Sequence, residues 1–180
     1  MKMILKRMFD ESEFLSDFGI RSLSKYHQEH PYKFAFDGGS MQVDYTPAES
    51  TGDMFGGNSN WRGPIWFPMN YLILDSLSKF SDYYGSDYEV EYPTNSGQMM
   101  NIKDAASGVS KRLLAMFTPG KDGKIPMYGE YEKMQSDPNF KDKHLFFEYF
   151  DGDTGKGLGA SHQTGWTGLI SEIIRQLYGK

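Results

Sequence analysis

Apolar side chains recur at steps of three and four residues in three long segments of this chain. Residues 166–177 carry one such face, and Gly179 follows as a natural stop. Residues 64–84 carry a second face, with Pro64 in a first-turn position where its missing N–H has no consequence. Residues 103–117 carry a third. This spacing predicts three long helices and therefore a mainly α fold.

Each expected helix has a set of apolar side chains that should point inward. In residues 64–84 they are Ile65, Trp66, Met69, Leu72, Ile73, Leu77 and Phe80. In residues 103–117 they are Ala105, Ala106, Val109, Leu113, Met116 and Phe117. In the C-terminal segment they are Trp166, Leu169, Ile170, Ile173, Ile174 and Leu177.

The apolar period changes from helical to alternating near residues 32–45, which predicts a small β-hairpin turning at residues 37–39. The segments 49–60, 85–101 and 120–143 are expected to be long loops. Loops of that length usually serve a function or lie against another part of a protein. The chain is therefore expected to be one part of a larger helical assembly.

Composition excludes several classes of function. The 180 residues fit one domain, and a net charge of −5 disfavours a nucleic-acid partner. The chain has no cysteine, which excludes disulfides and thiolate sites, and only four histidines, which gives a metal site little support. No signal peptide or membrane span is evident, so a cytoplasmic location without a membrane partner is expected. Aromatic residues reach 16%, enough to line a site with flat rings.

The densest polar and aromatic segment is residues 56–66, with the sequence GGNSNWRGPIW. Its Asn and Arg side chains donate hydrogen bonds, and two Trp rings lie in the same segment. Donors beside flat apolar faces suit a sugar, whose hydroxyls form hydrogen bonds while its C–H face stacks on a ring. The alternative is a helix N-cap at Asn58 or Ser59 with the tryptophans in the core.

A single carboxylate, Glu148, lies within the aromatic run FFEYF at residues 146–150. An apolar setting can make a carboxyl group useful as an acid or base near neutral pH. The alternative is a solvated or ion-paired side chain without a catalytic role.

Two familiar motifs fail in the glycine-rich turn that follows, residues 151–159. A calcium-binding EF-hand loop starting at Asp151 would need an acid at its twelfth position, which is His162. A phosphate-binding loop would need Gly where Phe150 stands. The remaining interpretation of these residues is a glycine-rich turn that shapes a site. His162 lies at the start of the expected C-terminal helix, where it could contribute to a binding site. The alternative is that this segment only begins the helix, with Thr164 as the capping residue.

Three segments together resemble the C-terminal part of glycoside hydrolase family 63, which includes the α-glucosidase that trims glucosylated mannosyl oligosaccharides and bacterial relatives acting on other α-glucosides or mannosylglycerate. They are residues 14–24, residues 57–68 (GNSNWRGPIWFP) and residues 147–167 (FEYFDGDTGKGLGASHQTGWT). The resemblance spans nearly the whole chain. It implies an (α/α)₆ toroid, the six-hairpin glycosidase type, of which residues 1–180 would form the C-terminal portion without the N-terminal helices.

The resemblance also implies roles for individual residues. Family members invert the anomeric configuration, with one carboxyl group as acid and another as base. Glu148 matches the general base, whereas the general acid would lie upstream, outside this chain. The residues implied to bind substrate are Asn60, Trp61, Arg62, Gly63, Trp66, Tyr149, His162 and Trp166.

The expected function is therefore that of an inverting α-glucosidase-like glycoside hydrolase acting on an α-glucosylated oligosaccharide or a small glucoside or mannoside. No cofactor is expected. The chain alone should be inactive, because it lacks the acid. Two alternatives remain: a non-catalytic carbohydrate-binding or vestigial fragment, and a structural module that needs a partner, either the N-terminal part of the same enzyme or a second copy.

Overall fold

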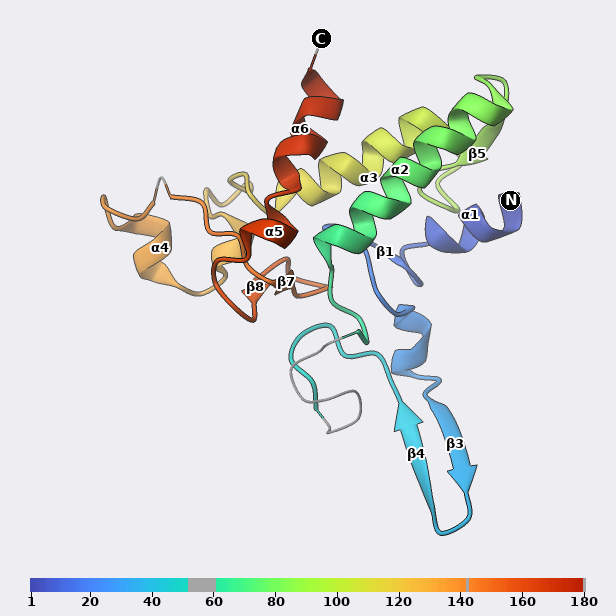
Figure 1. Cartoon of the computed structure of the whole chain (residues 1–180), viewed down its shortest axis with the longest axis horizontal. Coiled ribbons are helices and arrows are strands. Elements are labelled where there is room, and N and C mark those ends of the chain that lie inside the picture. The colour runs from blue at the N-terminus through green and yellow to red at the C-terminus, as the bar shows by residue number, and fades with distance from the viewer. Residues whose placement is uncertain (52–60, 142, 180) are drawn as a thin grey trace.

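A computed structural model describes residues 1–51, 61–141 and 143–179. In these ranges the chain combines helices with small two-stranded antiparallel sheets, so the fold is more mixed than the predicted mainly α class (Figure 1). The helices are α1 (Lys2–Met8), α2 (Phe67–Tyr84), α3 (Ile102–Ala115), α4 (Glu132–Ser136), α5 (Thr164–Thr167) and α6 (Ile170–Tyr178). The strands pair as β1 (Leu15–Ser16) with β2 (Gly19–Ile20), β3 (Tyr32–Phe36) with β4 (Gly39–Val43), β5 (Glu89–Glu91) with β6 (Met99–Asn101), and β7 (Tyr149–Phe150) with β8 (Gly157–Leu158).

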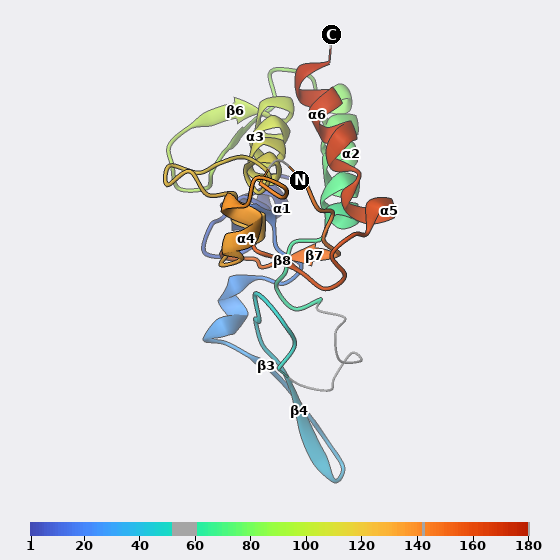
Figure 2. The same cartoon turned by 90° about the vertical axis from the view of Figure 1, so that its left-hand side faces the viewer.

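The two long helices α2 and α3 pack against each other in the upper part of the molecule (Figures 1 and 2). Both were predicted, with bounds of 64–84 and 103–117. Helix α2 begins later than predicted because Trp66 has an extended backbone at the N-cap, and Pro68 lies within the first turn. Helix α3 begins at Ile102, because the Asn101 side chain accepts a hydrogen bond from the Asp104 N–H at 2.9 Å.

The predicted apolar stripe of α2 is wrong in part. The face that packs against the core carries Phe67, Asn70, Leu74 and Leu77. Met69, Leu72 and Phe80, which were expected to point inward, are exposed. The sequence could not separate the two faces, because α2 is apolar on more than one side and the face buried here is the one that α3 covers.

Asn70 is a buried polar residue that joins α2 to β2. Its side-chain oxygen accepts the Ile20 N–H at 2.8 Å, and its nitrogen donates to the Ile20 carbonyl at 3.0 Å and to the Trp66 carbonyl at 3.1 Å. One amide thus satisfies both backbone groups of Ile20, which would otherwise be buried without partners. Asn70 therefore fixes β2, and the segment that follows it, against the start of α2.

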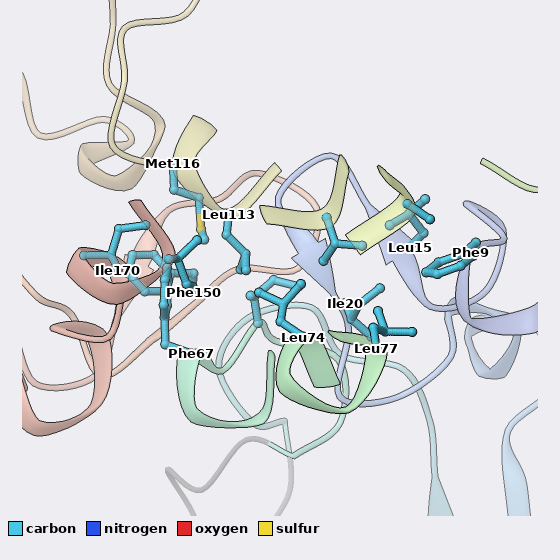
Figure 3. Packing of buried hydrophobic residues seen from close by; sticks show 14 of the residues in the cluster. Phe9, Leu15, Ile20, Phe67, Leu74, Leu77, Leu113, Met116, Phe150 and Ile170 are labelled. Carbon is cyan, nitrogen blue, oxygen red and sulfur yellow. The ribbon is translucent and has the colours of Figure 1, made fainter. Parts of the chain in front are cut away.

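The hydrophobic core lies between α2, α3 and the strand segments (Figure 3). At one end, the rings of Phe67, Phe117 and Phe150 meet edge to face, with centroids 5.5–5.9 Å apart. At the other end, Phe9 and Leu15 from the N-terminal segment pack against the helices. The inward residues predicted for α3 are buried or partly buried, as expected.

The predicted C-terminal helix is divided into α5 and α6 by a tight turn at Gly168 and Leu169. Ile170 and Ile173 are buried, and Leu177 packs against the core, as predicted. Ile174, also expected inward, is exposed. The division allows α5 to pack on α2 while α6 packs on α3.

The predicted β-hairpin is confirmed as β3 and β4, with Phe34 opposite Met41 and Phe36 opposite Gly39. It projects from the body of the molecule (Figures 1 and 2), and the side chains of β3 are exposed. Two of the predicted long loops are wrong: residues 85–101 contain the β5–β6 hairpin, and residues 120–143 contain α4 and a short 3-10 turn, Pro126–Tyr128. Helix α1 was not predicted. Among the described residues, every helix is too short or too polar to cross a lipid bilayer.

Candidate functional site

The two segments that the sequence singled out, residues 56–66 and 146–166, meet through the backbone. Ile65 N–H donates to the Phe150 carbonyl at 2.8 Å, and Phe150 N–H donates to the Ile65 carbonyl at 3.0 Å. On its other side Phe150 pairs with Gly157 in β8. The residue pair Ile65–Phe150 is thus the point where the segment before α2 joins the aromatic strand β7.

Four aromatic rings gather at this junction. Trp61 stacks on Trp66 with ring centroids 4.3 Å apart and planes 9° apart. Trp66 in turn stacks on Tyr149 at 4.8 Å and 23°. Trp166 meets the edge of Trp66 at 6.0 Å. We call Trp61, Trp66, Tyr149 and Trp166 the aromatic cluster; it contains every tryptophan in the chain.

The rings of the aromatic cluster differ in their exposure. Trp66 and Tyr149 are buried, whereas Trp61 is 41% exposed at the end of the stack and Trp166 is partly exposed. A ligand can therefore reach Trp61 and Trp166 directly, while the two covered rings hold them in place.

Glu148 directly precedes Tyr149 and is half-buried. Its Oε2 accepts the Ala160 N–H at 3.1 Å, and its own N–H donates to the Ala160 carbonyl at 2.9 Å. These contacts fix both the backbone and the carboxylate of Glu148 against the segment after β8.

Gly159 allows this arrangement, and two observations explain why a glycine stands there. Its backbone has φ of +68°, a conformation that other residues rarely adopt. A Cβ atom at this position would lie 2.6 Å from Glu148 Oε2 and 2.7 Å from Tyr149 Cε1. The glycine-rich turn therefore lets the backbone pass close to Glu148 and Tyr149, and its role in shaping a site stays a prediction.

Arg62 and Gly63 lie on the other side of the junction. Arg62 is buried, donates a hydrogen bond to the Ser50 hydroxyl and forms an ion pair with Asp44 at 3.7 Å. Gly63 has φ of +144°, and a Cβ there would lie 2.5 Å from the Thr46 carbonyl oxygen. Both residues thus contact the segment 44–50.

The remaining predicted site residues are spread around the cluster. His162 is exposed and lies beside the Phe146 ring, with centroids 5.5 Å apart. Asn60 falls outside the described residues. The described part of the chain contains no group of three or more His, Asp or Glu side chains arranged to hold a metal ion.

Sequence reasoning missed a segment that runs past the aromatic cluster, residues 44–50, which we call the strap. Glu49 in the strap accepts a hydrogen bond from the Tyr149 hydroxyl at 2.8 Å. Thr46 N–H donates to the Arg62 carbonyl at 2.6 Å, and the Pro47 carbonyl accepts the Gly152 N–H at 2.8 Å. No local sequence signal marks the strap, because its partners lie far away in the chain.

A polar cluster holds the start of the strap. Tyr45 accepts a hydrogen bond from Arg21 Nε at 3.0 Å and donates to Asp153 Oδ1 at 3.0 Å. Arg21 Nη2 and Lys25 Nζ approach the same carboxylate oxygen at 3.1 and 3.2 Å. We call these four residues, Arg21, Lys25, Tyr45 and Asp153, the Asp153 cluster.

The electrostatics of the Asp153 cluster keep Tyr45 neutral and Asp153 ionised. Burial raises the pKa of the Tyr45 phenol, so it remains a hydrogen-bond donor. Burial alone would also raise the pKa of Asp153. The hydrogen bond from Tyr45 and the positive charge of Arg21 outweigh that effect, and the pKa of Asp153 lies below its usual range.

A cavity of about 640 Å³ opens beside Trp61 and Trp66. Its polar side is formed by Arg7, Arg21, Ser22, Ser24 and His27. Its apolar side, formed by α1 and α2, includes Ile4, Met8, Met69 and Ile73. Glu148 is not among its lining residues. The volume falls within the usual range for small-ligand sites.

Comparison with known proteins shows which family this chain belongs to. A sequence model described as the mannosylglycerate hydrolase MGH1-like glycoside hydrolase domain matches residues 1–167. The chain belongs to this glycoside hydrolase family. The resemblance to family 63 inferred from three segments is thereby confirmed.

Individual relatives of this glycoside hydrolase chain are much longer. An uncharacterized protein of Saccharomyces cerevisiae is 53% identical over 95% of the chain and 16% of its own length. A probable mannosyl-oligosaccharide glucosidase of Schizosaccharomyces pombe is 29% identical over 97% of the chain and 15% of its own length. An α-glucosidase of Arabidopsis thaliana, alpha-glucosidase 2, is 27% identical over 66% of the chain. The chain spans about a sixth of the length of the first two relatives.

Proposed function

We propose that this chain supplies the general base and part of the sugar site of an inverting α-glucosidase that acts on an α-glucosylated oligosaccharide. The aromatic cluster beside Glu148 is the observation that carries the proposal. Aromatic faces bind the C–H surface of a sugar, and a carboxylate held beside them can act on the bond between two sugars. Family membership supplies the reaction class, glycoside hydrolysis.

In this proposal Glu148 takes a proton from a water molecule, which attacks the anomeric carbon as the glycosidic bond breaks. A second carboxylic acid gives its proton to the departing oxygen. We place that acid outside this chain, as the family resemblance implies. Trp61 and Trp166 are the rings proposed to contact the sugar. Trp66, Tyr149, Arg62, Gly63 and His162 are proposed to complete the same subsite. Asn60, which lies outside the described residues, is proposed to bind the sugar, as the family resemblance implies.

We further propose that residues 1–180 form the C-terminal portion of an (α/α)₆ toroid. The exposed apolar side of α2 supports this. Met69, Leu72 and Phe80 line a second cavity, of about 330 Å³, between α1 and α2. Apolar surface of this kind usually lies in an interface. Helices from the part of the glycosidase that the relatives possess and this chain does not span are the proposed occupants.

The decisive experiment is an assay of hydrolysis with the chain joined to the missing part of the domain, taken from the Saccharomyces cerevisiae relative. The substrate is an α-glucosylated oligosaccharide, with mannosylglycerate as a second probe. Proton NMR of the first product distinguishes the stereochemistry, since inversion of an α-glucoside releases the β-anomer. Release of the α-anomer would contradict the proposed role of Glu148.

A second candidate function is sugar binding without turnover. Its prediction differs clearly: the joined protein would bind the oligosaccharide with unchanged affinity when Glu148 is replaced, and would release no sugar. Association of the chain with itself, measured by sedimentation without sugar, would instead favour a structural role for the apolar side of α2.

A further inference from the structure

The strap, residues 44–50, has no helix or strand of its own, yet it is attached at several points. The Tyr45 hydroxyl donates to Asp153, the Thr46 N–H donates to the Arg62 carbonyl, and Glu49 accepts from the Tyr149 hydroxyl. A backbone without secondary structure is ordered only where such contacts outweigh its conformational entropy. These attachments therefore determine where Glu49 lies.

Asp153 is the most heavily used of these attachments. One oxygen, Oδ1, receives Tyr45, Arg21 and Lys25, which belong to the strap and to the N-terminal segment. The Asp153 N–H donates to the Asp151 side chain at 2.8 Å, which fixes the turn that carries the carboxylate. Three charge-assisted hydrogen bonds on one oxygen make the position of Tyr45 depend on Asp153.

Glu49 connects the strap to the aromatic cluster. It binds the only polar atom of the Tyr149 side chain, at 2.8 Å, and Tyr149 stacks on Trp66, which stacks on Trp61. The exposed face of Trp61 is therefore oriented through a continuous series of contacts that begins at Asp153.

We propose that Asp153 and Glu49 are positioning residues, which act through the strap to orient the Trp61 ring for a neutral α-linked oligosaccharide. This inference rests on the proposed function, because it assumes that Trp61 meets a sugar. It also gives a role to the first part of the glycine-rich turn, residues 151–155, because that part presents Asp153 to the strap.

The test measures binding of maltotriose to the chain by the quenching of intrinsic tryptophan fluorescence, which reports only on the aromatic cluster. The variants are Asp153→Asn, Tyr45→Phe and Glu49→Ala, with Glu49→Gln as the conservative variant. Exposed Asp82 in α2 gives the control Asp82→Asn, which removes the same charge outside the network. Melting temperatures are measured in parallel.

We expect Asp153→Asn and Glu49→Ala each to weaken maltotriose binding about tenfold, equivalent to ~1.4 kcal/mol. Glu49→Gln should bind nearly as the wild type, since its amide oxygen still accepts the Tyr149 hydroxyl. The double variant Asp153→Asn/Glu49→Ala should bind no more weakly than Glu49→Ala, because both act through one route. Tyr45→Phe removes only the hydroxyl that binds Asp153. If Asp153→Asn does not fold, the maltotriose affinity of Tyr45→Phe tests the same contact.

In the binding measurement, two results would overturn the inference. One is a lower melting temperature with unchanged affinity, which would leave Asp153 a structural role alone. The other is additive losses in the double variant. If the wild-type chain alone does not bind maltotriose, the proposed function still stands, because part of the sugar site is proposed to lie outside this chain. Near-ultraviolet circular dichroism of the tryptophans then decides the inference. Asp153→Asn and Glu49→Ala should share one altered spectrum, and a wild-type spectrum in both would overturn the inference.

Discussion

Trp61 lies flat on Trp66, with ring centroids 4.3 Å apart and planes 9° apart, and only Trp61 of the two is exposed. The pair thus combines a buried ring, which belongs to the core, with an exposed ring, which can meet a ligand. Replacing each one separates stability from binding.

Trp66→Ala should destabilise the fold by about 3–5 kcal/mol, because it removes a large buried side chain. Trp61→Ala should lower the free energy of unfolding by only about 1 kcal/mol, the worth of one ring contact. In the joined enzyme, which combines this chain with the missing part of the domain, Trp61→Ala should also raise KM. The reason is that a stacking ring already contacts the sugar in the ground state, before the transition state. Denaturant unfolding and steady-state kinetics on both variants check this pair; a Trp61→Ala enzyme with unchanged KM would contradict the proposed contact.

Glu148→Gln should lower kcat of the joined enzyme by about two to four powers of ten, with KM little changed. The amide keeps the size of the side chain but does not take a proton from water at neutral pH. The hydrogen bond from Ala160 can still be accepted, so the melting temperature should stay close to that of the wild type. If Glu148→Gln retained most of kcat, Glu148 would not be the general base.

Asp153 should make the chain sensitive to acid. Its pKa is lowered in the folded state, so its ionised form adds stability above the unfolded pKa of about 3.9. That stability is lost as the pH falls through the lower, folded value. Asp153→Asn should therefore be less stable than the wild type at pH 6, with a difference that shrinks below about pH 4. Thermal melts across this range measure it, and a constant difference would argue against an ionised Asp153.

Asn70→Leu should destabilise the chain by about 2–4 kcal/mol, because it leaves the buried N–H and carbonyl of Ile20 without partners. Asn101→Ala is a useful comparison, since it removes a helix cap and should lower the free energy of unfolding by about 1 kcal/mol. Equal losses in the two variants would show that Asn70 contributes little beyond ordinary helix stability.

Neighbouring leucines on α2 test the proposed toroid. Leu72 is 55% exposed and Leu74 is 4% exposed. Leu72→Lys should change the stability of this chain by less than about 0.5 kcal/mol, whereas Leu74→Lys should prevent folding. In the joined domain Leu72→Lys should become strongly destabilising. If it stays neutral there, the apolar side of α2 is not covered by the added helices.

The sequence predicted those elements whose pattern depends on short-range spacing. The β3–β4 hairpin and the inward side of α3 follow from alternation and helical period, and both are confirmed. Helix α2 shows the limit of this reasoning: its period was right, but a helix that is apolar on two sides does not reveal which side α3 covers. Helix α1 is a single short run with one buried residue, too little for a periodic signal.

The candidate site was predicted in part for a similar reason. Family resemblance indicated the two segments that meet at Ile65 and Phe150, and the structure brings them together. It gave no indication of Glu49 or Tyr45, because their roles depend on partners about a hundred residues away. Arg62 was expected to line the sugar site, and the structure shows its side chain held by Asp44 and Ser50 of the strap.

The Ile65–Phe150 pairing has a consequence for how the protein acquires its site. The contacts within the β3–β4 hairpin and within each helix close short loops, which is entropically easy and fast. The Ile65–Phe150 hydrogen bonds close a loop that contains both α2 and α3. Trp166 should therefore reach the Trp61–Trp66 pair only after those helices have formed, and on a growing chain only after α5 has been synthesised. Any partly folded state that lacks this late step has a helical pair without the complete aromatic cluster.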